Sequence, residues 1–408
     1  MSHLLLINSG KAEALGELRA VVPEARVTVL TEPAYRPQYP AGTDLVFVGD
    51  IGDLTAVRKA VLALSATNPV DHVVSPSERS MPAGGFLRSY LGLPGTGFDV
   101  ANRFTNKAVM KRALTDLGLP VAAHRVVSGL PAAVRAAAEL GGPVVVKPAF
   151  GTGSMNVHGF DSPARLAEFA TSAAADKLRN AGCPLLVEEK IAMSAEYHAD
   201  AVIVGSEVRF CSVGRYLVPQ LDPVGRLNGS AIVPADSPAA AAVRALHEQV
   251  ALGLGLRDGV THCEIYETPA GLVVGEISCR PAGGGIADAI KTQYGVDIWD
   301  AFNRLALGLP VALPPAGRAV GGIVAVCLLP VRPGRVLRVT PAEELEALDG
   351  VLSVSMKVGP GSVIGTRLHS ASTAGILLLE APDEETLGKR VDRVVEQFRL
   401  DVEALCGD

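Results

Sequence analysis

The stretch "PVVVKPAFGTGSMNV", Pro143 to Val157, ends a run of three valines on a lysine and then enters a glycine-rich loop. The valines predict a buried strand, and Pro148 ends it because proline has no N–H for a ladder hydrogen bond. The loop Gly151, Thr152, Gly153 and Ser154 lets backbone N–H groups approach an anion closely. It is not a Walker A loop, because no Gly-Lys-Ser/Thr closes it and strand-like sequence follows. The stretch is typical of an anion contact, although an ordinary hairpin turn has the same composition.

Composition predicts a globular protein of several domains. The chain has 408 residues, of which 48% are hydrophobic and 20% charged, and this length suggests about two to four domains. The net charge of −6 argues against nucleic-acid and anionic-membrane partners, because no basic surplus can neutralise phosphates. The six cysteines are scattered without zinc spacing, so we expect reduced thiols with no catalytic role. The N-terminus lacks the basic region of a signal peptide and the apolar runs are too short to span a bilayer, which predicts a cytoplasmic protein.

Residues 1–102 are predicted to form an N-terminal α/β domain. Strand-like runs at 3–8, 26–31, 44–50 and 71–76 alternate with helical apolar spacing at 11–22 and 54–66. This alternation predicts a Rossmann-like parallel sheet covered on both faces. The turn after the first strand lacks the G-x-G-x-x-G fingerprint, which argues against dinucleotide binding by this domain.

The rest of the chain predicts three further units, at 103–190, 191–310 and 311–408, so the fold class is α/β and α+β multidomain. Residues 102–121 have the pattern of one helix that stops at Gly118, and residues 162–182 have the pattern of another. Strands between 184 and 281 are predicted to be antiparallel, with a two-residue Gly205-Ser206 turn of type II′. Further helices are expected at 235–255 and 296–308, before a proline-rich connection and a final α+β segment.

A hairpin at 261–281 offers two carboxylates on one face. A three-residue loop, Pro269 to Gly271, would set Glu264 directly opposite Glu276. Carboxylates across a ladder repel, and a divalent cation such as magnesium removes the conflict. Ser278 and Arg280 follow Glu276 by strand alternation and share its face. These residues predict a metal site beside a cation that can bind phosphate or carboxylate.

Each of these features also has an ordinary explanation. A loop one residue longer or shorter would place the two glutamates on opposite faces, where they could be surface charges. A helical lysine such as Lys107 is usually solvated, and the double glutamate in "LLVEEKI" could also lie on the surface. His198 shares a face with Glu196 in "EYHAD", so it either borders the substrate or has a structural role.

The order of these motifs along the chain resembles that of the ATP-grasp superfamily. The order is a helical lysine, a lysine ending a strand, a glycine loop, a double glutamate, a further glutamate, and a hairpin with two glutamates and E-x-S-x-R. The resemblance covers roughly residues 102–307, and the preceding α/β domain matches the usual N-terminal domain of the family. Within the superfamily, the chain looks most like the carboxylate–amine ligases that join amino acids. They have a segment similar to residues 279–308 and a C-terminal extension of this size.

The resemblance implies a role for each motif residue. Lys107 and Lys147 would hold the ATP phosphates, and the loop of Gly151, Thr152, Gly153 and Ser154 would cover them. The backbone of Glu188, Glu189, Lys190 and Ile191 would contact adenine, with the Glu188 carbonyl on the amino group, and Glu196 would bind the ribose. Metal ligands would be Glu264, Glu276 and Ser278, the last at a position where the family usually has asparagine. Arg280 and Lys147 would act in catalysis, and the substrate would contact His198, Arg280, Gly283, Gly284 and Gly285.

The implied reaction is ATP-dependent amide-bond formation that releases ADP and phosphate. ATP would convert a small carboxylate, expected to be an amino acid, into an acyl phosphate that an amine then attacks, with one or two Mg²⁺ (or Mn²⁺) ions as cofactors. Lysines, metal and backbone N–H groups would neutralise the phosphates while a mobile glycine loop excludes water. Two alternatives stay open, an ATP-grasp carboxylase that uses bicarbonate and a non-catalytic nucleotide-binding regulator. Secondary metabolism and a homodimer are both compatible with the resemblance.

Overall fold

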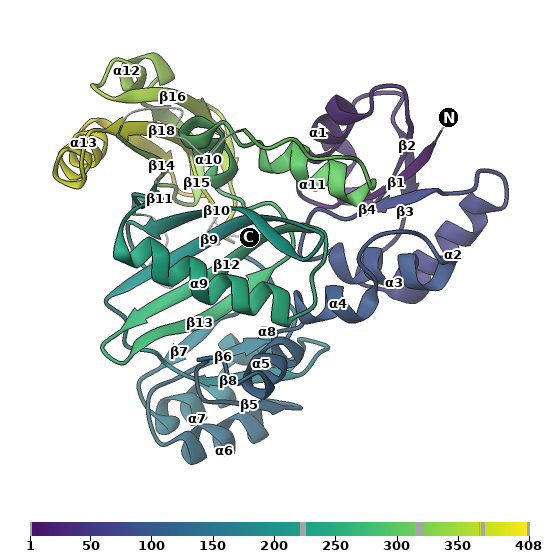
Figure 1. Ribbon diagram of the computed structural model, residues 1–408. Coiled ribbons are helices and arrows are strands. Elements are labelled where there is room, and N and C mark those ends of the chain that lie inside the picture. Colours follow the sequence, from purple (N-terminus) through teal and green to yellow (C-terminus); the bar gives the residue numbers. More distant parts are fainter. Residues whose placement is uncertain (1, 221–225, 315–321, 367, 369–371, 406–408) are drawn as a thin grey trace.

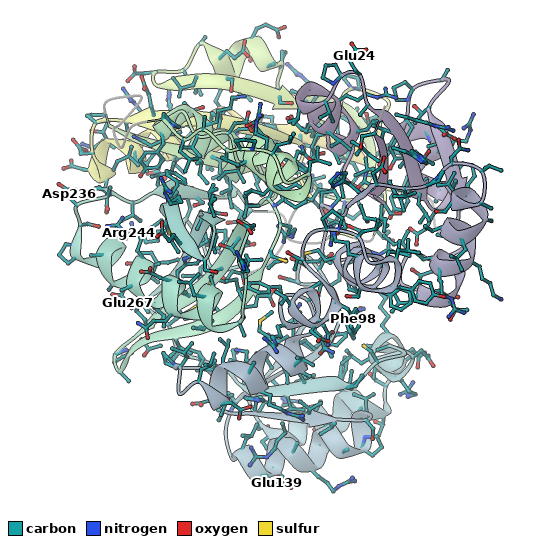
Figure 2. All side chains as sticks on the ribbon, turned by 45° about the vertical axis from the view of Figure 1, so that its right-hand side comes forward. Glu24, Phe98, Glu139, Asp236, Arg244 and Glu267 are labelled. Atoms are coloured by element: carbon teal, nitrogen blue, oxygen red, sulfur yellow. The ribbon has the colours of Figure 1, made fainter. Side chains whose placement is uncertain are left out.

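The computed structural model describes residues 2–220, 226–314, 322–366, 368 and 372–405, and their strands form four sheets (Figure 1). Charged side chains such as Glu24, Glu139 and Asp236 stand at the periphery of the molecule (Figure 2). No helix in these ranges is long and apolar enough to cross a membrane.

The first sheet is parallel, as the alternating pattern predicts, and has the strand order β3-β2-β1-β4. Its strands are β1 (His3–Ile7), β2 (Arg26–Thr31), β3 (Asp44–Phe47) and β4 (His72–Val74). Its helices are α1 (Ala14–Val21), α2 (Leu54–Ser65) and α3 (Met81–Leu91), with a 3₁₀ helix at Pro33–Gln38. The chain builds β2 and β3 on one side of β1 and returns to place β4 on the other. The carboxyl ends of β1 and β4 therefore form a topological switch point, where ligands bind in open α/β sheets.

The single helix predicted at 102–121 is wrong, because the chain forms α4 (Phe98–Arg103) and α5 (Lys107–Asp116). Asn106 is extended, and its side chain accepts hydrogen bonds from the N–H groups of Ala108 and Val109. This N-cap begins a new helix, and its extended backbone interrupts the apolar periodicity. Lys107 is consequently the first residue of α5, and its side chain starts from a helix terminus.

The second sheet has the order β5-β8-β6-β7 and carries the lysine and the double glutamate. Its strands are β5 (His124–Val127), β6 (Val144–Pro148), β7 (His158–Phe160) and β8 (Leu185–Glu189). The helix predicted at 162–182 is three pieces, α7 (Pro163–Thr171), a 3₁₀ turn (Ala173–Ala175) and α8 (Asp176–Arg179), because Ser172 is extended. These pieces and α6 (Leu130–Leu140) pack with the sheet in one apolar core.

The third sheet is antiparallel and has the order β13-β12-β9-β10-β11-β14-β18-β16. Its strands up to residue 278 are β9 (Ala195–Val204), β10 (Glu207–Tyr216), β11 (Asn228–Ile232), β12 (Gly259–Thr268) and β13 (Gly271–Ser278). On one face lie α9 (Pro238–Gly253) and α5. On the other, α10 (Ile286–Tyr294) and α11 (Ile298–Ala306) form a core shared with the N-terminal sheet. Helices α10 and α11 thus connect the two sheets.

The turn between β9 and β10 differs from the predicted type II′. Gly205 has a φ of +61° and Ser206 a φ of +65°. Positive φ at both central residues defines a type I′ turn, whereas type II′ needs it only at the first. Serine therefore occupies a left-handed position that glycine or asparagine usually fills.

The C-terminal segment contributes to two sheets. Strands β14 (Ile323–Leu329), β16 (Val351–Met356) and β18 (Gly375–Ala381) extend the large antiparallel sheet. Strands β15 (Gly334–Val339), β17 (Val363–Ile364) and β19 (Leu400–Glu403) form a sheet of their own, with α12 (Ala342–Glu346) and α13 (Glu384–Gln397) nearby. A boundary near residue 311 therefore divides the chain but does not divide the large sheet.

Candidate active site

A cavity of about 740 Å³ lies where the N-terminal sheet, the small sheet and the large sheet meet. The residues predicted from the sequence that line it are Lys107, Lys147, Gly151, Thr152, Gly153, Ser154, Glu188, Glu189, Lys190, Ile191, Glu196, Glu264, Glu276, Ser278, Arg280, Gly283 and Gly284. The structure therefore brings together residues that are up to 177 positions apart in the sequence, from Lys107 to Gly284.

The predicted pairing of Glu264 with Glu276 is confirmed, but the predicted loop is wrong. The turn has two residues, Pro269 and Ala270, and a bulge at Gly275 restores the register between the turn and the glutamates. A Cβ at Gly275 would lie 2.7 Å from Tyr266 Cζ and 3.1 Å from the Glu264 carbonyl oxygen, so this bulge requires glycine. The turn is one residue shorter than predicted and the bulge adds one residue to β13, so the register at the glutamates is unchanged and both carboxylates lie on one face.

The electrostatics of this pair favour a bound cation. Burial and the neighbouring Glu276 raise the pKa of Glu264 well above its usual value. Burial also opposes ionisation of Glu276, but Lys107 and Lys147 hold its pKa below the usual value. Ser278 Oγ is buried and has no hydrogen-bond partner among the described residues. Two carboxylates and an unpartnered hydroxyl form an all-oxygen donor set, which fits magnesium.

Lys107 connects the glycine-rich loop to the glutamate pair. Its Nζ donates to the Gly151 carbonyl at 2.9 Å and lies 3.4 Å from Glu276 Oε2. Its backbone N–H donates to the Ala149 carbonyl at 2.9 Å. These contacts hold the start of α5 against the N-terminal end of the glycine-rich loop, so a phosphate under the loop would meet the ammonium of Lys107.

Lys147 belongs to a buried group that also contains Lys111 and Glu188. Glu188 lies 2.7 Å from Lys147 Nζ and 3.1 Å from Lys111 Nζ, and Lys111 also donates to the Val274 carbonyl at 3.0 Å. Burial alone would raise the pKa of Glu188, but the two lysines lower it to about 2. Burial lowers the pKa of Lys111, while the glutamates keep that of Lys147 above its usual value. Glu188 therefore holds Lys147 charged at the cavity wall.

The segment after β8 forms another wall of the cavity. Glu188 pairs with His124 on one side and Val145 on the other, whereas Lys190 follows the end of the strand. Further along, Glu196 Oε2 accepts a hydrogen bond from the N–H of Gln220 at 2.8 Å. This wall therefore combines backbone at a strand end with a buried carboxylate.

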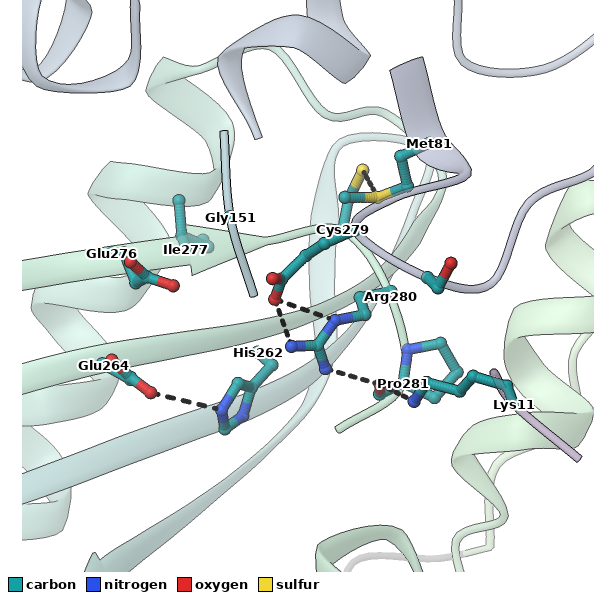
Figure 3. Close-up of polar contacts among 12 residues, drawn as sticks. Lys11, Met81, Gly151, His262, Glu264, Glu276, Ile277, Cys279, Arg280 and Pro281 are labelled. Atoms are coloured by element: carbon teal, nitrogen blue, oxygen red, sulfur yellow. Dashed lines mark hydrogen bonds and ion pairs between the residues drawn. The ribbon is translucent and has the colours of Figure 1, made fainter. Parts of the chain in front are cut away.

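Arg280 is held by a residue of the N-terminal domain. Its guanidinium donates from Nε and Nη2 to Glu78 Oε1, the former at 3.1 Å, and from Nη1 to the Pro281 carbonyl at 2.9 Å (Figure 3). Glu78 follows β4, so this ion pair joins the parallel sheet to the hairpin. Burial opposes the charge, but Glu78 raises the pKa of Arg280 above its usual value, so the guanidinium stays charged.

Two predicted substrate contacts do not line the cavity. His198 is buried and hydrogen-bonded to Asp200 at 2.5 Å and to Ser230, and Asp200 also accepts from His262 at 2.9 Å. The N–O separations of 2.5 and 2.9 Å are hydrogen-bond lengths, so the three residues form a buried network. Gly285 packs toward Val326 and Ile376 of the large sheet, whereas Gly283 and Gly284 line the cavity.

Four charged residues that line the cavity were missed from the sequence: Lys11, Glu78, Arg79 and Lys111. Lys111 follows Lys107 by four positions, a spacing that puts both on one helical face. Lys11 and Glu78 follow β1 and β4, so the switch point of a parallel sheet was the available signal. Neither the helical spacing nor the switch point predicts which residues these side chains contact, because the partners of Lys11, Glu78 and Lys111 lie in other parts of the fold.

The chain is similar to amino-acid ligases along nearly its whole length. It is 34% identical over 381 residues to the L-arginine-specific L-amino acid ligase of Bacillus subtilis, covering 91% of each chain. Residues 326–403 match the family model described as L-amino acid ligase C-terminal domain 2.

Solved structures share this fold. The L-amino acid ligase from Bacillus licheniformis superposes with a TM-score of 0.78 at 18% identity, covering 99% of each chain. Carboxyaminoimidazole ribonucleotide synthase from Aspergillus clavatus, solved in complex with ATP, superposes with a TM-score of 0.72 at 18% identity, covering 97% of this chain and 98% of that one. The fold is thus the ATP-grasp fold. The chain belongs to the L-amino acid ligases of the ATP-grasp superfamily, enzymes that use ATP to form an amide bond between amino acids.

Proposed function

We propose that this enzyme activates the carboxylate of one amino acid as an acyl phosphate, lets the amine of a second amino acid attack it, and releases ADP and phosphate. The observation that supports this most is the pairing of Glu264 with Glu276 across one ladder, with Lys107 3.4 Å from Glu276. A triphosphate and a carboxylate are both anionic, and they can react only where their charges are neutralised.

The nucleotide is proposed to lie between the small sheet and the large sheet. Lys107, Lys147 and the loop at 151–154 would bind its phosphates. The segment from Glu189 to Ile191 would contact adenine, and Glu196 would bind the ribose. The strand pairing of Glu188 and its contacts with Lys111 and Lys147 support a second role for Glu188, namely fixing the phosphate-binding lysine.

Glu264, Glu276 and Ser278 are proposed to hold one or two magnesium ions, which would supply charge neutralisation at the phosphoryl group. Arg280, held by Glu78, is proposed to bind the acyl phosphate and the oxyanion that forms when the amine attacks. The loop at 151–154 would exclude water, which would otherwise hydrolyse the intermediate. None of these residues forms a covalent bond with the substrate in this scheme.

The test is to incubate the enzyme with ATP, Mg²⁺ and a panel of amino-acid pairs, and to assay nucleotide products and dipeptides. L-Arginine is the first member of the panel, since the Bacillus subtilis relative is named as arginine-specific. We expect ADP and phosphate in amounts equal to the dipeptide, and only when both amino acids are present. AMP and pyrophosphate would refute the acyl-phosphate route. ADP that forms only with bicarbonate would support a carboxylase.

A further inference from the structure

Lys11 lies at the carboxyl end of β1, at the switch point of the parallel sheet. The chain turns there at Gly10, whose φ is +94°. The backbone carbonyl of Lys11 accepts hydrogen bonds from Asn8 Nδ2 at 2.7 Å and from the Ala14 N–H at 3.3 Å. The lysine side chain therefore starts from a fixed backbone and reaches into the cavity.

The ammonium of Lys11 shares one neutral acceptor with a second cation. Its Nζ lies 5.3 Å from the centroid of the Trp299 ring and 3.4 Å from the Pro281 carbonyl oxygen. The same oxygen accepts a hydrogen bond from Arg280 at 2.9 Å (Figure 3). Within the described part of the chain, Lys11 forms no ion pair. Arg280 is already paired with Glu78. Among the described residues, the ammonium of Lys11 contacts only this carbonyl and the Trp299 ring, so the charge of Lys11 is the one that a bound anion would neutralise.

The position of Lys11 relative to the glutamate pair selects the anion. Arg280 stands between Lys11 on one side and Glu264 and Glu276 on the other (Figure 3). Arg280 lowers the pKa of Lys11, whereas Glu13 and Glu78 raise it. The carboxylate that receives the phosphoryl group must lie near the metal site. A carboxylate beside Lys11 would lie on the far side of Arg280 from that site. It would therefore not be phosphorylated, and it would remain intact through the reaction.

We propose that Lys11 binds the carboxylate of the amine-donating amino acid, the group that becomes the C-terminus of the dipeptide; this inference rests on the proposed ligase function. Gly283 and Gly284 follow Pro281 closely in the chain and line the cavity, and a Cβ at Gly283 would meet no atom within 4 Å, so there is open space beside this glycine. Lys11 thereby determines specificity, because it distinguishes an α-amino acid from an amine without a carboxylate. It forms no covalent bond and transfers no proton.

The experiment compares amine donors with and without the carboxylate. The twenty L-amino acids and their primary amides are offered as amine donors to the wild-type enzyme and to Lys11→Met, which retains the aliphatic side chain over Trp299. We expect Lys11→Met to raise KM for the amino acids roughly 10- to 100-fold, the loss of one hydrogen bond to a charged group. KM for the amides, KM for ATP and kcat should stay within twofold. Lys59→Met, an exposed lysine on α2, is the matched control and should change none of them.

A second variant separates charge from folding. Lys11→Arg should keep the preference for amino acids over amides. Burial and Arg280 lower the pKa of Lys11 to about 8, opposed only in part by Glu13 and Glu78. The ratio of kcat/KM for amino acids, Lys11→Arg over wild type, should therefore rise above about pH 8, where lysine loses its charge and arginine keeps it.

Two outcomes would overturn the inference. One is that KM rises equally for amino acids and amides in folded Lys11→Met, or does not rise for either. The other is a raised KM for the carboxylate donor in place of the amine donor. If Lys11→Met does not fold, the inference is overturned when the ratio of kcat/KM for amino acids, Lys11→Arg over wild type, does not change with pH. A wild-type enzyme that releases no ADP with any pair refutes the proposed function itself, and that result is visible before any variant is made.

Discussion

Glu264 and Glu276 show how a single pair of residues carries chemical information. Like charges directly across a ladder destabilise a hairpin by themselves, so their presence indicates a ligand that stabilises the pair. Lys107 lies 3.4 Å from Glu276, while Lys111 and Lys147 pair with the buried Glu188 nearby. The presence of each buried charge is therefore explained only by the opposite charges around it.

Glu276→Gln tests the metal site. The amide keeps the shape of the side chain but removes one negative charge, so we expect kcat to fall roughly 10³-fold. Thermal unfolding should stay close to that of the wild type, since the substitution also removes the repulsion with Glu264. Glu343→Gln on the exposed face of α12 is the control. A Glu276→Gln enzyme with full activity would contradict the metal assignment.

Glu188→Gln tests the buried lysine group through its pH dependence. Removal of the charge leaves Lys111 and Lys147 buried without their partner, so the free energy of unfolding at pH 7 should fall by about 3 kcal/mol or more. The pKa of Glu188 in the folded protein is about 2, below its unfolded value, so its stabilisation is complete above the unfolded pKa and is lost as pH falls toward 2. Urea unfolding of both proteins at pH 7, 5 and 3.5 should therefore show a difference that is constant at first and then shrinks. A difference that grows at low pH would refute this account.

The elements show where local rules were sufficient and where they failed. The parallel strands of the N-terminal domain and the strand that carries Lys147 follow from the apolar pattern alone, because they are short apolar runs with clear breakers. The helix break at Asn106 was not predicted, since a single N-cap interrupts an otherwise continuous pattern. The Glu264–Glu276 register was predicted from a wrong loop, because the bulge at Gly275 compensates for the shorter turn.

Gly275→Ala tests that bulge. The added Cβ would lie 2.7 Å from the Tyr266 ring, so either the ring or the strand must move. We expect a loss of about 1–3 kcal/mol in the free energy of unfolding, together with weaker Mg²⁺-dependent ATP binding because Glu264 and Glu276 shift. Gly388→Ala is a contrasting variant, since this exposed glycine inside α13 has open space around it and alanine should stabilise the helix by about 1 kcal/mol. If Gly275→Ala behaves as Gly388→Ala does, the bulge has no role in positioning the glutamates.

At the scale of the whole molecule, the cavity belongs to three sheets at once. The Glu78–Arg280 ion pair joins the parallel sheet to the hairpin, and the Lys111–Glu188 pair joins α5 to the small sheet. A ligand that contacts all three should stabilise the entire fold.

MgATP, proposed to lie between the small and large sheets, should raise the unfolding temperature of the whole chain in a single transition, because the Glu78–Arg280 pair connects the large sheet to the N-terminal sheet. At a concentration 100 times its Kd, the added stability is about 2.7 kcal/mol. ATP with EDTA should give a smaller shift, because Glu264 and Glu276 then repel both each other and the phosphates. Lys147→Met should lose most of the shift, whereas Lys59→Met should keep it. A shift that EDTA does not change would contradict metal-assisted binding.

The sequence by itself determined the order of the motifs and the parallel N-terminal sheet, because motif order and strand alternation are local properties. It also suggested the facing glutamates, but their register depends on a shorter turn and on the bulge at Gly275, which only the structure shows. Only the tertiary structure decided that Glu188 neutralises two lysines, that Glu78 holds Arg280, that His198 lies behind the cavity wall, and that Lys11 meets the same carbonyl as Arg280. Each of these contacts joins separate strands or sheets. Their geometry depends on how whole elements pack, and no local pattern along the chain encodes that.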